Sequence, residues 1–193
     1  MNGDPSSSIC VAEPRSGSEG GGATLPAGAP GDLPGIDIRI DDDGWLADLP
    51  CLEALTRETI REVLGCCGAG AAEVSVLYTD DNFMAGLNRQ YRGKSGTTNV
   101  LSFPADAPDT GEELMLGDIV LASGRVREEA QGQGKSLEHH VMHLLVHGTL
   151  HLLGHDHETG PEAAAMEALE VSVLGGLGVA DPYDADRKPA VEA

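Results

Sequence analysis

The sequence predicts an α+β fold, a small mixed sheet of about four strands with packed helices, and two observations support this class. Short segments that alternate between apolar and polar residues lie between longer segments with helical periodicity, so strands and helices are intermixed along the chain. The chain has 193 residues, of which 40% are hydrophobic, and this length favours one domain with a sizeable core. The order of the strands does not follow from these patterns.

The two ends of the chain are expected to lie outside this domain. Residues 1–35 contain 8 Gly, 5 Pro and 5 Ser and few large apolar side chains. Such a segment buries too little apolar surface to offset the entropy lost on ordering, so we predict a disordered tail. The folded domain should span residues 36–183, and residues 184–193 should form a second loose tail.

The first half of the domain alternates strands and helices. The strands alternate in polarity, and the helices place apolar side chains three and four residues apart. The acidic DDDG after the first strand is typical of a turn, and Asp80 or Asp81 is suited to cap the second helix. The expected elements are strand 36–40, helix 51–65, strand 73–79 and helix 82–91.

The second half pairs two strands and then continues as helices. A loop rich in Pro and Asp separates the strands. Ser123 and Ser136 are candidate capping residues, Pro161 suits the first turn of the last helix, and Gly175 marks the end of that helix. The expected elements are strand 99–103, strand 116–122, helix 123–131, helix 137–153 and helix 161–174.

Composition narrows the classes of function. The formal net charge is −20, which argues against broad binding to polyanions, so any contact with nucleic acid requires a local basic group. The four cysteines include a vicinal pair and no C-x-x-C spacing, which indicates reduced thiols rather than disulfides or a cysteine zinc site. No signal peptide and no membrane-spanning run are apparent, so we expect a cytoplasmic protein that does not bind membranes.

All seven histidines fall between His139 and His157, and this cluster is the most informative feature of the sequence. His147 and His151 are four residues apart on the predicted helix and therefore point the same way. Gly154 can adopt the left-handed conformation that ends a helix and brings His157 back toward them. Three neutral imidazoles with one open position is how a catalytic zinc site is built.

Other residues near the cluster have less certain roles. His155 competes with His157 as the third ligand, although the spacing favours His157. His143 is expected to pack or to hydrogen-bond behind the ligands, and binding to RNA is a third alternative. Asp156 either orients an imidazole or a water on the metal, or caps the turn through its own carboxylate.

The spacing of these histidines is similar to that of metzincin peptidases, with one difference. Those enzymes have a Glu directly after the first histidine, where it acts as general base. Here that position is Gly148, which has no side chain. The sequence therefore disfavours a metalloprotease.

Several motifs together closely resemble the YbeY family of bacterial endoribonucleases. They are LNRQYRGKSGTTNVLSFP (87–104), LGDIVLA (116–122), HGTLHLLGHDH (147–157), MEALE (166–170) and DPY (181–183). The resemblance covers about residues 36–183. It implies a metal-dependent, single-strand-specific endoribonuclease that acts in 16S rRNA 3′-end maturation, rRNA processing and ribosome quality control. It also implies one Zn²⁺ ion per chain, with His147, His151 and His157 as ligands and Arg92 as a functional arginine.

Arg89, Arg92 and Lys94 would form the basic group that RNA binding requires. The guanidinium of Arg92 matches two phosphate oxygens, so we expect Arg92 to be catalytic. We expect the same of His147, as a ligand of the metal ion. The nucleophile and the general base stay open. Because the chain is acidic, we expect the small ribosomal subunit or an assembly protein to present the RNA, notably the 16S rRNA precursor. The alternative is a noncatalytic ribosome-assembly factor with structural zinc, in which a fourth protein ligand closes the site.

Overall fold

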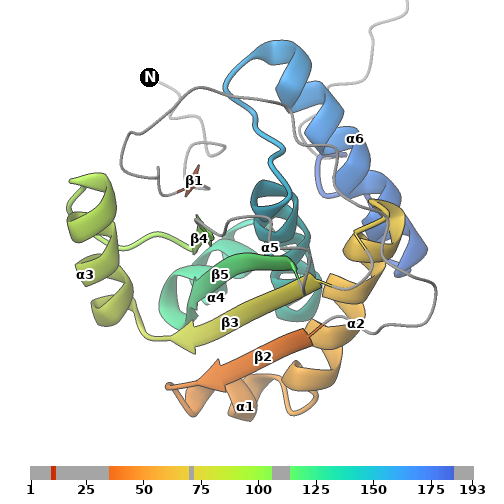
Figure 1. Ribbon diagram of the computed structural model, residues 1–193. Helices are drawn as coiled ribbons and strands as arrows, with labels where there is room; N and C mark the ends of the chain where they lie inside the picture. The colour runs from red at the N-terminus through yellow and green to blue at the C-terminus, as the bar shows by residue number, and fades with distance from the viewer. Residues whose placement is uncertain (1–9, 12–34, 70–71, 106–113, 185–193) are drawn as a thin grey trace, which may run out of the picture.

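The computed structural model describes residues 10–11, 35–69, 72–105 and 114–184. Its sheet has the strand order β1-β4-β5-β3-β2 (Figure 1). β2, β3 and β5 run parallel, whereas β4 is antiparallel to β5 and parallel to β1. The strands are β1 (Cys10–Val11), β2 (Gly35–Ile40), β3 (Ala72–Thr79), β4 (Val100–Pro104) and β5 (Leu114–Ala122).

The mixed sheet confirms the predicted fold class, and β2 to β5 are the four expected strands. β1 adds a fifth strand of two residues inside the segment that was expected to be disordered. The remainder of that segment, residues 1–9 and 12–34, lies outside the described residues apart from Gly35. Most of the predicted loop after β4 and nearly all of the predicted C-terminal tail also lie outside them.

Helices cover both faces of the sheet (Figure 1). α2 and α5 pack on one face, and α6 packs against these two helices. α3 packs on the opposite face through Met84 and Leu87, which contact apolar residues of β3, β4 and β5. The described helices are α1 (Gly44–Asp48), α2 (Leu52–Cys66), α3 (Asp81–Arg92), α4 (Ser123–Gly132), α5 (Leu137–Leu152) and α6 (Gly160–Gly176).

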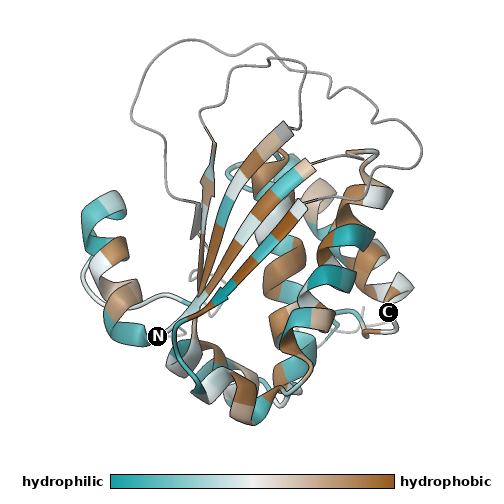
Figure 2. Cartoon of the chain, turned by 60° about the horizontal axis from the view of Figure 1, so that its bottom comes forward, coloured by the Kyte–Doolittle hydropathy of each residue, from teal (hydrophilic) through white to brown (hydrophobic). Residues whose placement is uncertain are grey.

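The polarity of the strands explains this layering. Residues along β2 and β3 alternate between buried and less buried positions, as a strand with one face on a core requires. Figure 2 shows the alternation of hydrophobic and polar residues along the strands. None of the described helices combines the length and the apolar character needed to cross a lipid bilayer.

The predicted caps are confirmed at two helices. Asp80 begins α3 by accepting the amide of Phe83 at 2.8 Å, and the Ser136 hydroxyl accepts the amide of His139 at the start of α5. Thr159 caps α6 with Pro161 in its first turn.

One local prediction is wrong, and one short helix was not predicted. Ser123 is the first residue of α4 rather than its cap, and its side chain hydrogen-bonds the carboxylate of Asp42, which lowers the pKa of that carboxyl. The turn expected after β2 continues into the single-turn helix α1, which is too short to show helical periodicity. α1 buries Trp45, whose indole N–H donates to the carbonyl of Thr79 at 3.2 Å.

α5 is the central helix of the fold. Every residue from His140 to Leu152 is buried, so its histidine stripe does not face solvent along the helix. α5 lies close to the sheet at Gly148, where a Cβ atom would be 3.0 Å from Ser102 Oγ and 3.2 Å from Ile119 Cγ2. The Ser102 hydroxyl donates to the Gly148 carbonyl at 3.2 Å. Glycine therefore permits the close approach of α5 to β4 and β5.

The contact at Gly148 predicts the effect of adding one methyl group there. We expect Gly148→Ala to lower the free energy of unfolding by about 1–3 kcal/mol, because the new Cβ overpacks this contact. Gly65→Ala is the matched control, since a Cβ at that position in α2 meets nothing within 4 Å. This variant should gain roughly 0.5–1 kcal/mol from helix propensity. Urea unfolding of both variants checks the prediction, which fails if the two substitutions shift stability equally.

Candidate metal centre

Three histidines converge at the C-terminal end of α5. His147 and His151 lie on the same side of the helix, and their Nε2 atoms are 2.9 Å apart. The chain leaves the helix through Gly154, whose φ of 87° lies in the left-handed region. The turn returns His157 to the other two, so that one nitrogen from each ring lies within 4.8 Å of the others. This cluster is the one predicted from the spacing of the sequence.

The hydrogen bonds of the rings indicate where their protons are. His151 Nδ1 lies 2.8 Å from the carbonyl oxygen of His155, which can only accept, so Nδ1 carries the proton. His147 Nδ1 lies 2.6 Å from Glu170 Oε1, where a proton on nitrogen is also required if the carboxylate is ionised. In both rings the lone pair is then on Nε2.

Two nitrogen lone pairs therefore face each other across 2.9 Å. Such an arrangement is repulsive unless a cation lies between the nitrogens. Zinc–nitrogen bonds of about 2.05 Å at tetrahedral angles separate the two nitrogens by roughly 3.3 Å, which is close to the spacing observed here. The three imidazoles thus fit a divalent metal ion by both their chemistry and their separation.

Glu170 of α6 supports this cluster from behind. Its side chain is buried, and Oε2 lies 3.4 Å from His143 Nε2 while also accepting the hydroxyl of Tyr183. Burial alone would raise the pKa of Glu170, but hydrogen bonds from His143 and His147 outweigh it and lower that pKa. The carboxylate is therefore ionised and holds the Nδ1 proton of His147 in place.

Sequence reasoning missed Glu170 and Tyr183, which it noted only inside the MEALE and DPY motifs. One signal was present for the glutamate. Glu170 is four residues from Met166 and four from Leu174, and both of these apolar residues are buried. A glutamate on the apolar face of a helix requires a buried partner.

Burial keeps His147 and His151 neutral. It lowers the pKa of His151 to about 3, and the nearby imidazoles of His147 and His157 contribute further to this shift. Burial also lowers the pKa of His147, although the carboxylate of Glu170 opposes this effect. Neutral imidazoles are the form that binds metal, so both rings are ready to bind near pH 7.

The third histidine opens the cluster to solvent. His157 is exposed, whereas His147 and His151 are buried. The neighbouring Asp156 accepts the amide of His157 at 2.7 Å, and His155 contributes its backbone carbonyl to His151. Among the described residues, the group that can hold a metal consists of the three histidines. Asp156 and the side chain of His155 do not belong to it. His143 lies behind the cluster, against Glu170 and Tyr183.

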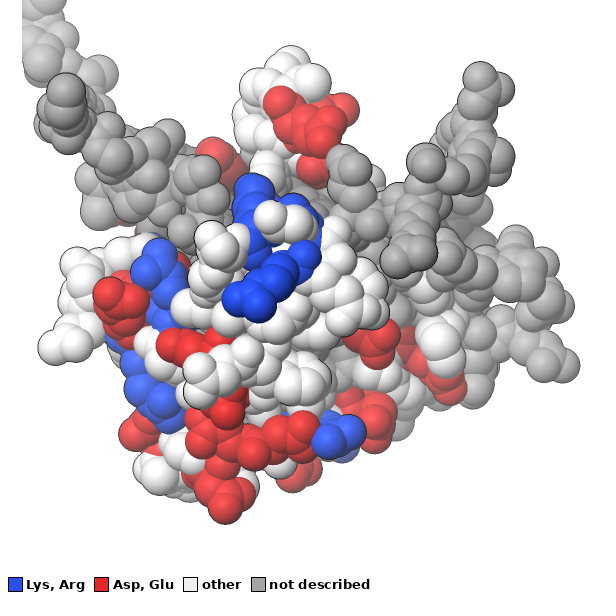
Figure 3. Space-filling model, turned by 90° about the vertical axis from the view of Figure 1, so that its left-hand side faces the viewer, with Lys and Arg blue, Asp and Glu red and all other residues white. Residues whose placement is uncertain are grey.

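The predicted arginine lies on a different element. Arg92 is in the last turn of α3 together with Arg89, and its guanidinium donates to Asn88 Oδ1 at 3.3 Å. No hydrogen bond or ion pair between described residues joins Arg92 to the histidines. Figure 3 shows basic side chains gathered on the side of the molecule that α3 forms.

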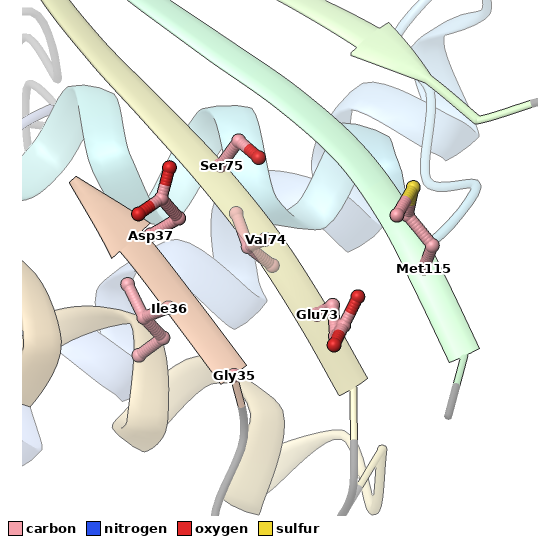
Figure 4. A pocket seen from close by; sticks show the side chains of 7 residues that line it. All are labelled: Gly35, Ile36, Asp37, Glu73, Val74, Ser75 and Met115. Atoms are coloured by element: carbon pink, nitrogen blue, oxygen red, sulfur yellow. The ribbon is translucent and has the colours of Figure 1, made fainter. Parts of the chain in front are cut away.

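A separate hollow lies where β2, β3 and β5 begin (Figure 4). Its lining includes the carboxylates of Asp37 and Glu73 and the side chain of Met115, and none of its described lining residues is a histidine or a basic residue. Two carboxylates without a cation repel a phosphate group. The histidine cluster is therefore the better candidate for a functional site.

Comparisons with known proteins show which family this chain resembles over most of its length. The family model described as Endoribonuclease YbeY matches residues 47–178. A protein named Endoribonuclease YbeY from Rhodopseudomonas palustris (strain BisB5) is 45% identical over 166 residues, covering 80% of this chain and 85% of its own length. A protein of the same name from Bartonella henselae is 43% identical over 152 residues, covering 77% of this chain and 96% of its own length.

A solution structure from Thermotoga maritima is also similar. It is 23% identical, covers 82% of this chain and 99% of its own, and has a TM-score of 0.47. This likeness is too weak to support an inference about function.

The position of Glu170 predicts its effect on metal binding. We expect Glu170→Gln to weaken Zn²⁺ binding by about 10- to 100-fold, because an amide no longer holds the Nδ1 proton of His147 with a full negative charge. Competition with a chromophoric chelator measures the dissociation constant. Glu58→Gln, an exposed change on α2, is the control and should bind Zn²⁺ like the unaltered chain. Equal affinities in all three proteins would show that Glu170 does not support the ligands.

The lowered pKa of His151 predicts how the metal-free protein responds to acid. Between about pH 6.5 and pH 3 the unfolded chain protonates this ring and the folded chain does not. The contribution of this ring to the free energy of unfolding is therefore largest above pH 6.5. It should decrease by about 1 kcal/mol for each unit that the pH falls below this value. Urea unfolding in chelator at pH 7, 6 and 5 measures the slope.

His151→Gln should reduce this slope, and His139→Gln should not, since His139 is exposed at the other end of α5. An equal free energy of unfolding of the metal-free protein at pH 7 and pH 5 would contradict the lowered pKa of His151.

Proposed function

This chain belongs to the YbeY family of endoribonucleases, and on that basis we propose that it is a metal-dependent, single-strand-specific endoribonuclease. It would act as a hydrolase on phosphodiester bonds, with one Zn²⁺ ion held by His147, His151 and His157. The observation that carries the proposal is the convergence of these three imidazoles, two of which face each other with Nε2 lone pairs.

The number of ligands favours catalysis over a structural role. Structural zinc normally has four protein ligands, whereas the described part of the chain offers three in this cluster, one of them exposed. The site is thus open on the side of His157, where a substrate can approach. A bound divalent ion would supply a Lewis acid for a phosphodiester oxygen and would lower the pKa of water. These features favour an enzyme over a noncatalytic assembly factor.

The geometry of Gly148 argues against peptide hydrolysis. The Cβ direction at this position points at Ser102 and Ile119 of the sheet, so the backbone leaves no space for the glutamate that a metzincin peptidase would have there.

We assign the two catalytic roles to His147 and Arg92. His147 holds the ion and is itself oriented by Glu170, while Asn88 accepts a hydrogen bond from Arg92. The guanidinium of Arg92 would bind and orient the phosphate group, since its fork matches two phosphate oxygens. Asp156 would support the ligands by accepting the amide of His157 in the turn. His143 would support them through its contact with Glu170.

We also propose a substrate and a setting from family membership. The substrate would be the 16S rRNA precursor, cleaved in the cytoplasm during 3′-end maturation, rRNA processing and ribosome quality control. The net charge of −20 supports a partner that presents the RNA, because most of such a surface repels a polyanion. The small ribosomal subunit or a ribosome-assembly protein would have this role.

The proposal predicts distinct defects in two variants. His147→Ala should lose both Zn²⁺ binding and cleavage of single-stranded RNA, because it removes a ligand. Arg92→Ala should keep its Zn²⁺ and cleave about 10²- to 10³-fold more slowly, since one charged contact to the phosphate is lost. Metal analysis and gel-based cleavage assays on the purified proteins measure the two effects.

Arg39→Ala is the control for Arg92→Ala, because Arg39 is an exposed arginine on β2 that pairs with Asp41. It should cleave like the unaltered chain. Cleavage at an undiminished rate by His147→Ala would refute the assignment of the metal centre. The end groups of the products, a cyclic phosphate or a 3′-hydroxyl, would identify the nucleophile.

A further inference from the structure

We infer that the exposed ring of Tyr91 is a stacking platform for one base of single-stranded RNA. This inference rests on the proposed function and names a substrate contact outside the histidine cluster. Tyr91 is in the last turn of α3, directly before Arg92.

The aromatic ring is held in place and still accessible. The Tyr91 and Phe103 rings are 5.0 Å apart at 71°, an edge-to-face contact. The residue is 48% exposed. Met84 and Leu87, on the same face of α3, pack on the sheet, and Tyr91 continues that face toward solvent. The ring is therefore fixed by Phe103 and open to a second flat group.

The charge around Tyr91 selects an anionic partner. Arg89 and Arg92 share its helical turn, and Lys94 follows three residues after Tyr91. The other exposed large apolar residues of the described chain have acidic neighbours. Leu46 lies on α1 between Asp43 and Asp48, Phe83 follows the acidic start of α3, and Met115 pairs with Glu73. An exposed aromatic ring beside cations is typical of binding to single-stranded nucleic acid.

The platform and the metal-binding helix both contact β4, on opposite faces of the sheet. Phe103 follows Ser102 in β4, and the Ser102 hydroxyl donates to the carbonyl of Gly148, the residue after His147. One strand thus connects the support of Tyr91 with the backbone of the metal-binding helix. An RNA strand bound at the histidines can extend past β4 to Tyr91 only if its bases are unpaired, because a duplex keeps both faces of each base stacked.

Binding of RNA strands of increasing length tests the inference. The probes are fluorescein-labelled 2′-O-methyl oligouridylates, confirmed intact by gel, with the full-length Zn²⁺-loaded protein. Fluorescence anisotropy should show about tenfold weaker binding of long strands by Tyr91→Ala, and Tyr91→Phe should stay within about twofold of the unaltered chain. Short strands that do not reach the platform should bind all three proteins equally.

Two further measurements separate stacking from structural damage and from charge. Tyr91→Leu keeps an apolar contact with Phe103 but lacks a flat ring, so it should bind long strands as weakly as Tyr91→Ala. Tyr91→Ala should leave the dependence of binding on salt unchanged, whereas Arg89→Ala should reduce that slope by about one.

Long-strand affinity that is unchanged in Tyr91→Ala, or restored in Tyr91→Leu, overturns the inference and leaves this ring to a protein partner or to packing. The proposed function fails separately. If the chain binds these strands through Tyr91 but cleaves no RNA, the proposed nuclease activity is refuted and the platform stands. If the chain cleaves RNA but Tyr91→Ala binds long strands normally, the platform is refuted and the nuclease activity stands.

Discussion

The pairing of buried histidines with carboxylates from neighbouring helices is the interaction on which this structure depends. α5 carries His140, His143, His147 and His151 into the core, where at least one nitrogen of each ring has a polar partner. Nδ1 of His140 and Nδ1 of His143 have none among the described residues. α4 supplies Glu129 to His140 at 3.2 Å, and α6 supplies Glu170 to His143 and His147. α6 is thus held against α5 by the same carboxylate that orients the candidate ligand His147. Packing and chemistry cannot be altered independently at these positions.

The parts of the site that follow from local spacing could be predicted from the sequence. His147 and His151 share a helix face because they are four residues apart, and Gly154 with its left-handed backbone returns His157 to them. The strands and the longer helices were likewise predictable, because each repeats its polarity pattern over several residues. In each of these cases the information lies within one short stretch of chain.

The parts that were missed depend on contacts between distant residues or on very short elements. Glu170 is 23 residues from His147, and Tyr183 is 13 residues from Glu170, so no local pattern joins them. α1 has five residues and β1 has two, too few to show a period. Ser123 was suited to a cap by residue type, but Asp42, far away in the sequence, takes its hydroxyl instead.

Metal binding at the proposed site would link metal supply to the lifetime of the fold through the position of His157. This residue lies on the connection between α5, which carries the other two histidines, and α6, which carries Glu170. An ion bound by all three would therefore tie this connection to the core, and mass action would then stabilise the folded chain as the free ion concentration rises. Chelation would release the connection first and expose it to proteases. The abundance of this protein in a cell would then report on zinc availability.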